Sequence, residues 1–378
     1  MRFGYGTNGF SNHRLDDALA VIAGLGYEGV ALTLDHHHLD PFDANLSRHV
    51  REVGRRLQEL GLGVVIETGA RYLLDPWRKH APTLLDDEPG PRLEFLRRAV
   101  RIGADLGAEA VSFWAGVPPR KEAGVRPGAE VGGSPGAKVG GSPGAKVGGS
   151  PGAEAGGSPH AELGGSPHAA AGGSQREKVG VTLREKDGRS QREDVRRPPR
   201  AEVGRSQRAE VERSQRAEAG ATPRGLERDE AWRRLVTGCA EVLAAAEGVE
   251  MMLGFEPEPG MLVETIDDWE RLRADLGAPV HFGLTLDIGH CRCLEPVPAD
   301  ECVRKAAGSL VNVQIDDMRR GVHEHLEFGQ GEVDFPPVLR ALSDIGYGGL
   351  VCVELPRHSH AAPAVARASL EFLKAVAA

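Results

Sequence analysis

Four short apolar runs in the second half of the chain each end at a side chain that carries an oxygen donor. These side chains are Glu256, Asp287, Gln314 and Glu354, and His290 stands three residues after Asp287. Because the carboxyl ends of parallel strands meet at one mouth of a β/α barrel, the donors are expected to converge there. Oxygen donors suit Mn²⁺ or Mg²⁺, and a nearby imidazole keeps Zn²⁺ and Co²⁺ open. The sequence therefore predicts one divalent metal ion, held by the four strand-end residues.

The elements that must position these residues alternate between short β-rich runs and segments of helical periodicity. Such alternation is typical of parallel βαβ construction. About eight strand–helix units over roughly 270 residues, once a long interruption is removed, match the usual size of a (β/α)8 TIM barrel. Helices are expected to stop at Gly26, Gly61 and Gly107. The predicted fold is thus an α/β TIM barrel.

The interruption follows the fourth predicted strand. Residues 118–224 repeat with a period of eight and contain many Gly, Pro and Ser residues and alternating charges. With almost no large apolar side chains such a segment cannot offset its ordering entropy by burial, so it is predicted to be a disordered insertion. A stacked repeat architecture, or binding of nucleic acid by its Arg-rich half, is the alternative. Residues 1–117 and 225–378 would then be the two parts of the barrel.

Composition restricts the class of protein. A formal charge of -9 with 5% aromatic residues argues against a nucleic-acid binder. The five cysteines include no CxxC pair and suit reduced thiols. No signal peptide core and no run of membrane-spanning length is recognisable. We expect a cytoplasmic protein that binds a small molecule and no membrane.

Two motifs carry a resemblance to a known family. Glu256, Asp287 with His290, Gln314 and Glu354 form the first, and a His-x-x-x-Gly-x-Gly-x-x-Asp signature over residues 325–334 forms the second. Together they resemble the xylose isomerase-like TIM barrel superfamily, which includes sugar phosphate isomerases and epimerases and the AP endonuclease family 2. The family's strand-seven ligand is normally histidine, and here it is Gln314, which Asp316 or His323 could compensate.

The resemblance implies a sugar isomerase or epimerase. Its acid/base pair, Glu256 and Glu354, would move a proton through an enediolate of a sugar, sugar phosphate or cyclitol. The substrate would be contacted by His290, His323, His325, Arg320, His37 and Glu67. Enzymes of this type often associate, so a homo-oligomer is expected.

Two alternatives stay open. His290, His323 and His325 resemble a histidine-rich zinc site of endonuclease IV-type enzymes, which would favour hydrolysis of a phosphoester. Glu67 and Trp114 argue against it, because those nucleases place histidines at the corresponding strand ends. A non-catalytic, metabolite-binding barrel is the second alternative.

Overall fold

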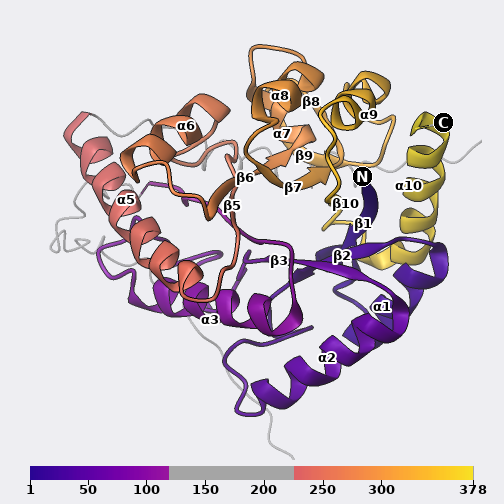
Figure 1. Cartoon of the computed structure of the whole chain (residues 1–378), viewed down its shortest axis with the longest axis horizontal. Coiled ribbons are helices and arrows are strands. Elements are labelled where there is room, and N and C mark those ends of the chain that lie inside the picture. Colours follow the sequence, from indigo (N-terminus) through magenta and orange to yellow (C-terminus); the bar gives the residue numbers. More distant parts are fainter. Residues whose placement is uncertain (119–224, 378) are drawn as a thin grey trace, which may run out of the picture. The chain divides into compact units, whose positions relative to one another are not determined.

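The structure is a computed structural model that describes residues 1–118 and 225–377. These residues form a closed barrel of eight parallel strands in the order β1-β10-β7-β6-β5-β4-β3-β2. Helices surround the strands (Figure 1). The predicted TIM barrel is confirmed. The gap in the described residues falls between β4 and α5, where the insertion was predicted, and the predicted disorder of that insertion lies outside the described residues.

The first half of the barrel holds its first four strands. Its elements are β1 (Arg2–Gly6), η1 (Thr7–Phe10), α1 (Leu15–Leu25), β2 (Gly29–Thr33), α2 (Leu46–Leu60), β3 (Gly63–Glu67), α3 (Gly90–Leu106) and β4 (Val111–Phe113). Three helices end at glycines with positive φ: Gly26 at 97°, Gly61 at 65° and Gly107 at 65°. A residue without Cβ adopts this left-handed conformation without steric cost, so the chain can turn towards the next strand. The predicted helix stops are confirmed.

The second half returns to β1. Its elements are α5 (Gly225–Glu247), β5 (Leu253–Phe255), α6 (Ile266–Asp275), β6 (Phe282–Asp287), α7 (Ile288–Leu294), α8 (Ala299–Ala306), β7 (Leu310–Ile315), β8 (Asp317–Arg319), β9 (Val322–Leu326), α9 (Phe335–Asp344), β10 (Leu350–Val353), η2 (Ser359–Ala361) and α10 (Ala362–Ala377). β10 pairs with β1 in parallel and closes the barrel.

Two elements of this half were not predicted. α7 begins directly after β6, with Asp287 as its N-cap. β8 and β9 form an antiparallel hairpin between β7 and α9. Both lie on the carboxyl side of a barrel strand, where TIM barrels place their functional groups.

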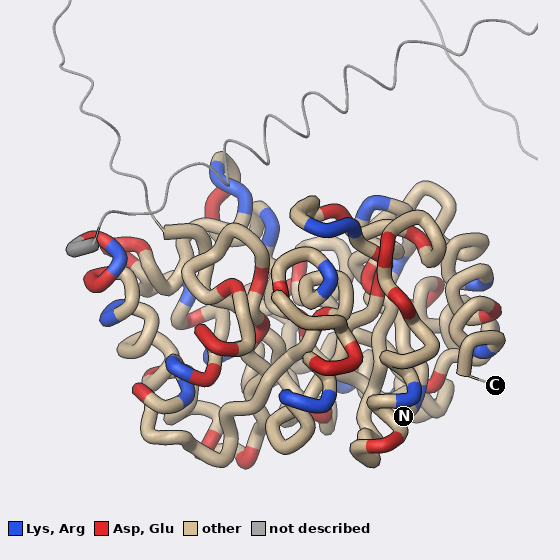
Figure 2. The backbone as a smooth tube through the Cα atoms, turned by 90° about the horizontal axis from the view of Figure 1, so that it is seen from above, with Lys and Arg blue, Asp and Glu red and all other residues tan. Residues whose placement is uncertain are grey.

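Acidic and basic residues are interspersed along the barrel (Figure 2). All five cysteines are free and buried. Among the helices of residues 1–118 and 225–377, none is long and apolar enough to cross a membrane.

Candidate active site

The predicted strand-end donors meet at one mouth of the barrel. Glu256 follows β5, Asp287 ends β6, Gln314 lies in β7 and Glu354 follows β10. The four strands are consecutive in the barrel wall, in the order β10-β7-β6-β5. The strand register pairs Asp287 with Gln314, and it pairs Gln314 with Cys352, two residues before Glu354. Parallel pairing therefore brings the four side chains to neighbouring positions.

Three groups of donor atoms are compact enough to hold a metal ion, and two of them share Asp287. The donor atoms of Glu256, Asp287 and His290 lie within 4.8 Å of one another, and so do those of Asp287, His325 and Glu354. Asp287 belongs to both groups. Carboxylate oxygens and imidazole nitrogens are together suitable ligands for Mn²⁺, Co²⁺ or Zn²⁺.

Unpartnered buried oxygens support a cation at this place. Oδ1 of Asp287 accepts the backbone N–H of His290 at 2.9 Å and so caps α7. Oδ2 of Asp287 and Oε1 of Gln314 are buried and have no hydrogen-bond partner in the described part of the chain. A buried acceptor without a partner is costly, and a bound cation would satisfy both oxygens. The residues present therefore fit a divalent metal.

The carboxyl groups of the mouth also raise one another's pKa. Burial, followed by repulsion from Glu354, raises the pKa of Glu256 well above its usual range. The same two causes act on Glu67. They also raise the pKa of Glu258 to about 8. Burial is the first cause for Glu354 as well, and His325 opposes the shift. A divalent cation would relieve this crowding of negative charge.

The raised pKa values predict how pH acts on the stability of the metal-free protein. Between the usual Glu pKa and the raised values, the folded protein binds more protons at these carboxyls than the unfolded chain does. Their contribution to the free energy of unfolding is therefore fully present below the usual Glu pKa and is lost as pH rises through the raised values. We expect the melting temperature in EDTA to fall between about pH 5 and pH 8, and saturating Mn²⁺ to remove most of that fall. Scanning calorimetry across this range tests it. A metal-free melting temperature that rises steadily with pH would contradict it.

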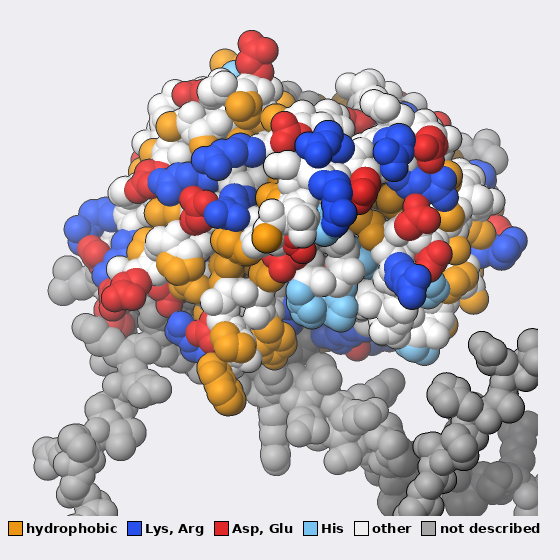
Figure 3. Space-filling model, turned by 90° about the horizontal axis from the view of Figure 1, so that it is seen from below, with side chains coloured by type: hydrophobic (Ala, Val, Ile, Leu, Met, Phe, Trp, Pro, Cys, Tyr) orange, Lys and Arg blue, Asp and Glu red, His pale blue; other side chains and the backbone are white. Residues whose placement is uncertain are grey.

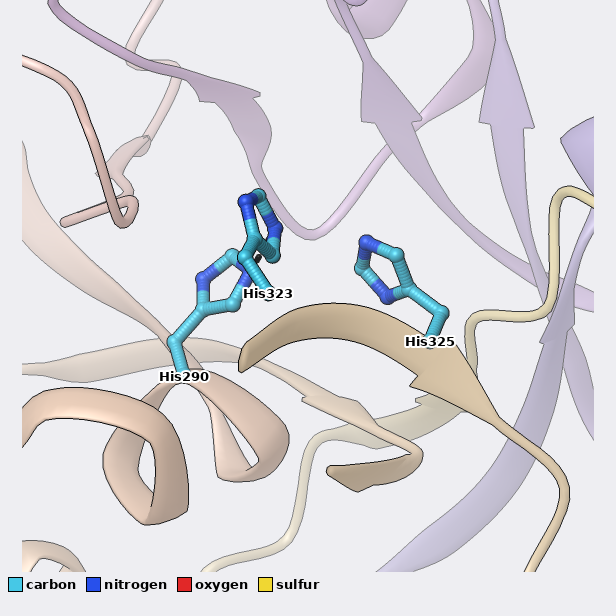
Figure 4. A group of neighbouring side chains, drawn as sticks. All are labelled: His290, His323 and His325. Carbon is cyan, nitrogen blue, oxygen red and sulfur yellow. Dashed lines mark hydrogen bonds between the residues drawn. The ribbon is translucent and has the colours of Figure 1, made fainter. Parts of the chain in front are cut away.

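Three histidines lie close together (Figure 4). His290 comes from α7, and His323 and His325 come from β9. The Nε2 atoms of His290 and His323 are 3.1 Å apart, and Nδ1 of His290 lies 3.2 Å from the carbonyl of Pro257. An N–H at Nδ1 donating to that carbonyl makes Nε2 of His290 the acceptor of a hydrogen bond from His323.

His325 differs from its two neighbours because it has a carboxylate partner. Its Nδ1 forms an ion pair with Oδ2 of Asp316, which is fully buried. Burial lowers the pKa of His325, but the Asp316 carboxylate outweighs it and raises the pKa to about 10. His290 and His323 show the opposite shift, because burial lowers the pKa of both.

Two asparagines that sequence reasoning missed position the glutamates. Nδ2 of Asn312 donates to Oε1 of Glu67 at 3.2 Å, which holds the Glu67 side chain inside the barrel. Nδ2 of Asn8 donates to Oε1 of Glu354 at 2.9 Å. Asn312 precedes Gln314 by two residues in β7, so the period of two along a strand could have placed it on the same face.

Two of the predicted substrate-binding residues do not join the acidic cluster, which is formed by Glu256, Asp287 and Glu354. Arg320 is exposed in the hairpin, and its guanidinium donates to the backbone carbonyl of Glu295. His37 is exposed after β2, with its ring 4.1 Å from that of His36. Within the described residues neither side chain has a hydrogen bond to the acidic cluster.

Histidine, basic and acidic side chains also reach the surface together on the face shown in Figure 3.

The glycine-rich signature is organised by Asp317, which sequence reasoning did not single out. Its carboxylate accepts the backbone N–H groups of Gly329 and Gly331 at 2.8 Å each and of Val333 at 3.0 Å. A Cβ at residue 331 would lie 2.3 Å from Oδ1 of Asp317, so only glycine fits there. The motif therefore folds a loop around a carboxylate at the base of the hairpin.

Asp317→Ala is expected to destabilise the protein by about 2–4 kcal/mol, because several hydrogen bonds to one buried charged group are lost. Urea denaturation followed by circular dichroism measures the change. Asp300→Ala, at an exposed ion pair with Arg304 on α8, is the control and should cost less than about 1 kcal/mol. Equal losses in the two variants would contradict this role.

Comparison with known proteins agrees with this geometry. Residues 201–376 match the family model described as the xylose isomerase-like TIM barrel. The matched part of the chain is thus similar to this family. The resemblance found in the motifs is thereby confirmed.

Two curated relatives match part of this sequence. The rhizopine catabolism protein MocC of Rhizobium meliloti is 34% identical over 154 residues, which cover 35% of this chain and 46% of MocC. The inosose dehydratase of Geobacillus kaustophilus is 28% identical over 145 residues, covering 33% of this chain and 46% of that enzyme. The matches thus span less than half the length of either relative.

Solved structures share the barrel fold. The apo form of the 3-keto-D-glucoside 4-epimerase YcjR of E. coli superimposes with a TM-score of 0.59 at 14% identity, covering 99% of each chain. A zinc-bound IolI protein gives 0.58 at 14% identity, covering 100% of this chain and 98% of IolI. At such identities the likeness shows the fold alone.

Proposed function

We propose that the protein is a metal-dependent isomerase or epimerase that acts on a sugar, a sugar phosphate or a cyclitol. The observation that carries this proposal is the pair of carboxyls Glu256 and Glu354. They stand on β5 and β10, with two barrel strands between them, and each has a pKa raised by burial. Asp287 lies between them at the end of β6.

Two such carboxyls are suited to moving a proton next to a carbonyl group. One glutamate, as the carboxylate, removes the proton, and the electron pair moves onto the carbonyl oxygen to give an enediolate of the substrate. The second glutamate, as the acid, returns a proton to the same or the neighbouring carbon. Raised pKa values bring both groups closer to the pH of the reaction, where each can serve as acid and as base.

A divalent metal ion, held by Glu256, Asp287, Gln314 and Glu354, would polarise the substrate carbonyl and lower the barrier to proton removal. Mn²⁺, Mg²⁺, Co²⁺ and Zn²⁺ all suit this donor set. His290, His323 and Glu67 border the same space and would orient substrate hydroxyl groups.

The names of the similar proteins support a polyhydroxylated substrate. They include an inosose dehydratase and a D-allulose 3-epimerase solved with D-allulose. Loss of water from a β-hydroxy ketone also begins with removal of a proton next to the carbonyl. Isomerisation, epimerisation and dehydration therefore share the step that this site would perform.

Hydrogen exchange with solvent tests the proposal. Ketoses, their phosphates and inososes would be incubated in D₂O with the Mn²⁺-loaded protein and followed by ¹H NMR. We expect one substrate to exchange the proton next to its carbonyl, and EDTA to stop the exchange. No exchange in any compound across this panel, with metal bound, would overturn the proposal.

The three-histidine cluster favours a second candidate, a zinc-dependent phosphoesterase. The donor atoms of His290, His323 and His325 lie within 4.8 Å of one another. This candidate requires two or three equivalents of zinc and hydrolysis of a phosphodiester. One equivalent of metal without such hydrolysis would exclude it.

A further inference from the structure

We propose that His325 of the β8–β9 hairpin supplies the imidazole ligand that β7 lacks, and that Asp316 is its positioning residue. The inference rests on the proposed function, because it concerns the metal of the same site. In the resemblance described above, a histidine is expected at the end of the seventh barrel strand, and this chain has Gln314 there. The hairpin would bring an imidazole to the same centre from outside the barrel wall.

The first argument is distance. The donor atoms of Asp287, His325 and Glu354 lie within 4.8 Å of one another. Atoms that bind one ion at about 2.0–2.2 Å lie at most about 4.4 Å apart. Small side-chain rotations therefore suffice to bring all three onto one ion.

The second argument is the partner of the ring. Nδ1 of His325 forms an ion pair with Oδ2 of the fully buried Asp316, which leaves Nε2 as the nitrogen available to a metal. A histidine that binds metal through one nitrogen usually donates its other N–H to a carboxylate or carbonyl, which fixes the ring and strengthens the ligand. The ion pair between Nδ1 of His325 and Oδ2 of Asp316 places the two residues for this arrangement.

The third argument is the space made for Asp316. A Cβ at residue 289 would lie only 1.9 Å from Oδ1 of Asp316. Gly289 stands in α7, between the Asp287 ligand and His290, where any larger residue would displace the Asp316 carboxylate. The first turn of α7 thus admits the carboxylate that holds His325.

The fourth argument concerns the competing imidazoles. Both ring nitrogens of His290 have neighbours, since Nδ1 lies by the carbonyl of Pro257 and Nε2 by His323. His290 would have to break a hydrogen bond to bind a metal, and His323 would lose the same bond. His325 would break no hydrogen bond within the described residues if it bound a metal through Nε2.

The test uses the full-length protein loaded with Mn²⁺. Pulsed electron paramagnetic resonance detects coupling between the ion and a directly bound ¹⁴N nucleus. We expect a coupling from one imidazole in the wild type and its loss in His325→Gln. Loss of a residue that only supports a metal ligand weakens metal binding by about 10–100-fold. Titration calorimetry should show that His325→Gln, which removes the ligand itself, weakens Mn²⁺ binding by at least that factor.

Four further variants make the result specific. Asp316→Asn should keep a ¹⁴N coupling of altered size and weaken Mn²⁺ binding by about 10–100-fold. Glu324→Gln, on the same hairpin and paired with Arg357, should bind Mn²⁺ as the wild type does and so controls for the fold of β9. His290→Gln should keep the coupling. Gln314→His should improve Mn²⁺ affinity by less than about threefold, because the imidazole position is already filled.

The contrary outcomes are distinct. A coupling that persists in His325→Gln and vanishes in His290→Gln overturns this inference and leaves the proposed function standing. A coupling lost only in His325→Gln, in a protein that exchanges no sugar proton, upholds the inference and overturns the proposed function. Tight Mn²⁺ binding without any ¹⁴N coupling in the wild type overturns the inference alone.

Discussion

Glu354→Gln is expected to lower kcat by about 10²–10⁴-fold, the usual contribution of one acid/base group. The amide has the shape of the carboxyl, and its oxygen can still accept the N–H of Asn8 that now reaches Oε1 at 2.9 Å. It cannot take up or return a proton. The loss should therefore appear in kcat, with little change in melting temperature, and steady-state kinetics beside calorimetry measure both.

A matched control separates this effect from the loss of any buried glutamate. Glu295 is also buried, and its Oε1 accepts the backbone N–H of Ile266 at 2.7 Å. Glu295→Gln keeps an acceptor there and should change kcat by less than about threefold. If both variants lose activity equally, Glu354 has no specific acid/base role.

Asp287→Asn is expected to have the second large effect, on metal binding. The amide oxygen can replace Oδ1 as the cap of α7, but the charge at Oδ2, which has no hydrogen bond within the described residues, is lost. Asp287 belongs to two of the three compact donor groups. Mn²⁺ affinity should therefore fall by more than about 100-fold, which exceeds the cost of losing a residue that only supports a ligand.

Titration calorimetry with Mn²⁺ measures the affinity, and activity at increasing Mn²⁺ shows how much of the lost turnover returns. Asp300→Asn on the surface of α8 is the control, and its Mn²⁺ affinity should match that of the wild type. Unchanged affinity in Asp287→Asn would remove this residue from the metal site.

Local sequence signals predicted the barrel and the positions of its strand ends. Glycines ended the predicted helices because the left-handed conformation at Gly26, Gly61 and Gly107 is a local property. Glu256 and Asp287 were placed correctly because a barrel fixes where strand ends lie. These features depend on periodicity and on strand order, and both can be read along the chain.

The hairpin and its partners could not be predicted in the same way. β9 (Val322–Leu326, VHEHL) has apolar residues only at its two ends, so it lacks the alternation or the apolar run that identifies a strand. Asp317 accepts N–H groups from residues 12 to 16 positions away, and this contact depends on the folded loop. The direction of the Arg320 side chain depends on the hairpin, so its exposed position could not be predicted either.

The central claim, that the acidic cluster holds a catalytic metal, is tested most directly by metal analysis. The purified wild type and a Glu256→Ala, Glu354→Ala double variant would be loaded with Mn²⁺, dialysed and analysed for metal. The account predicts about one equivalent in the wild type and none in the variant, with both proteins folded. No metal in the wild type after reconstitution, or equal metal in both proteins, would contradict it.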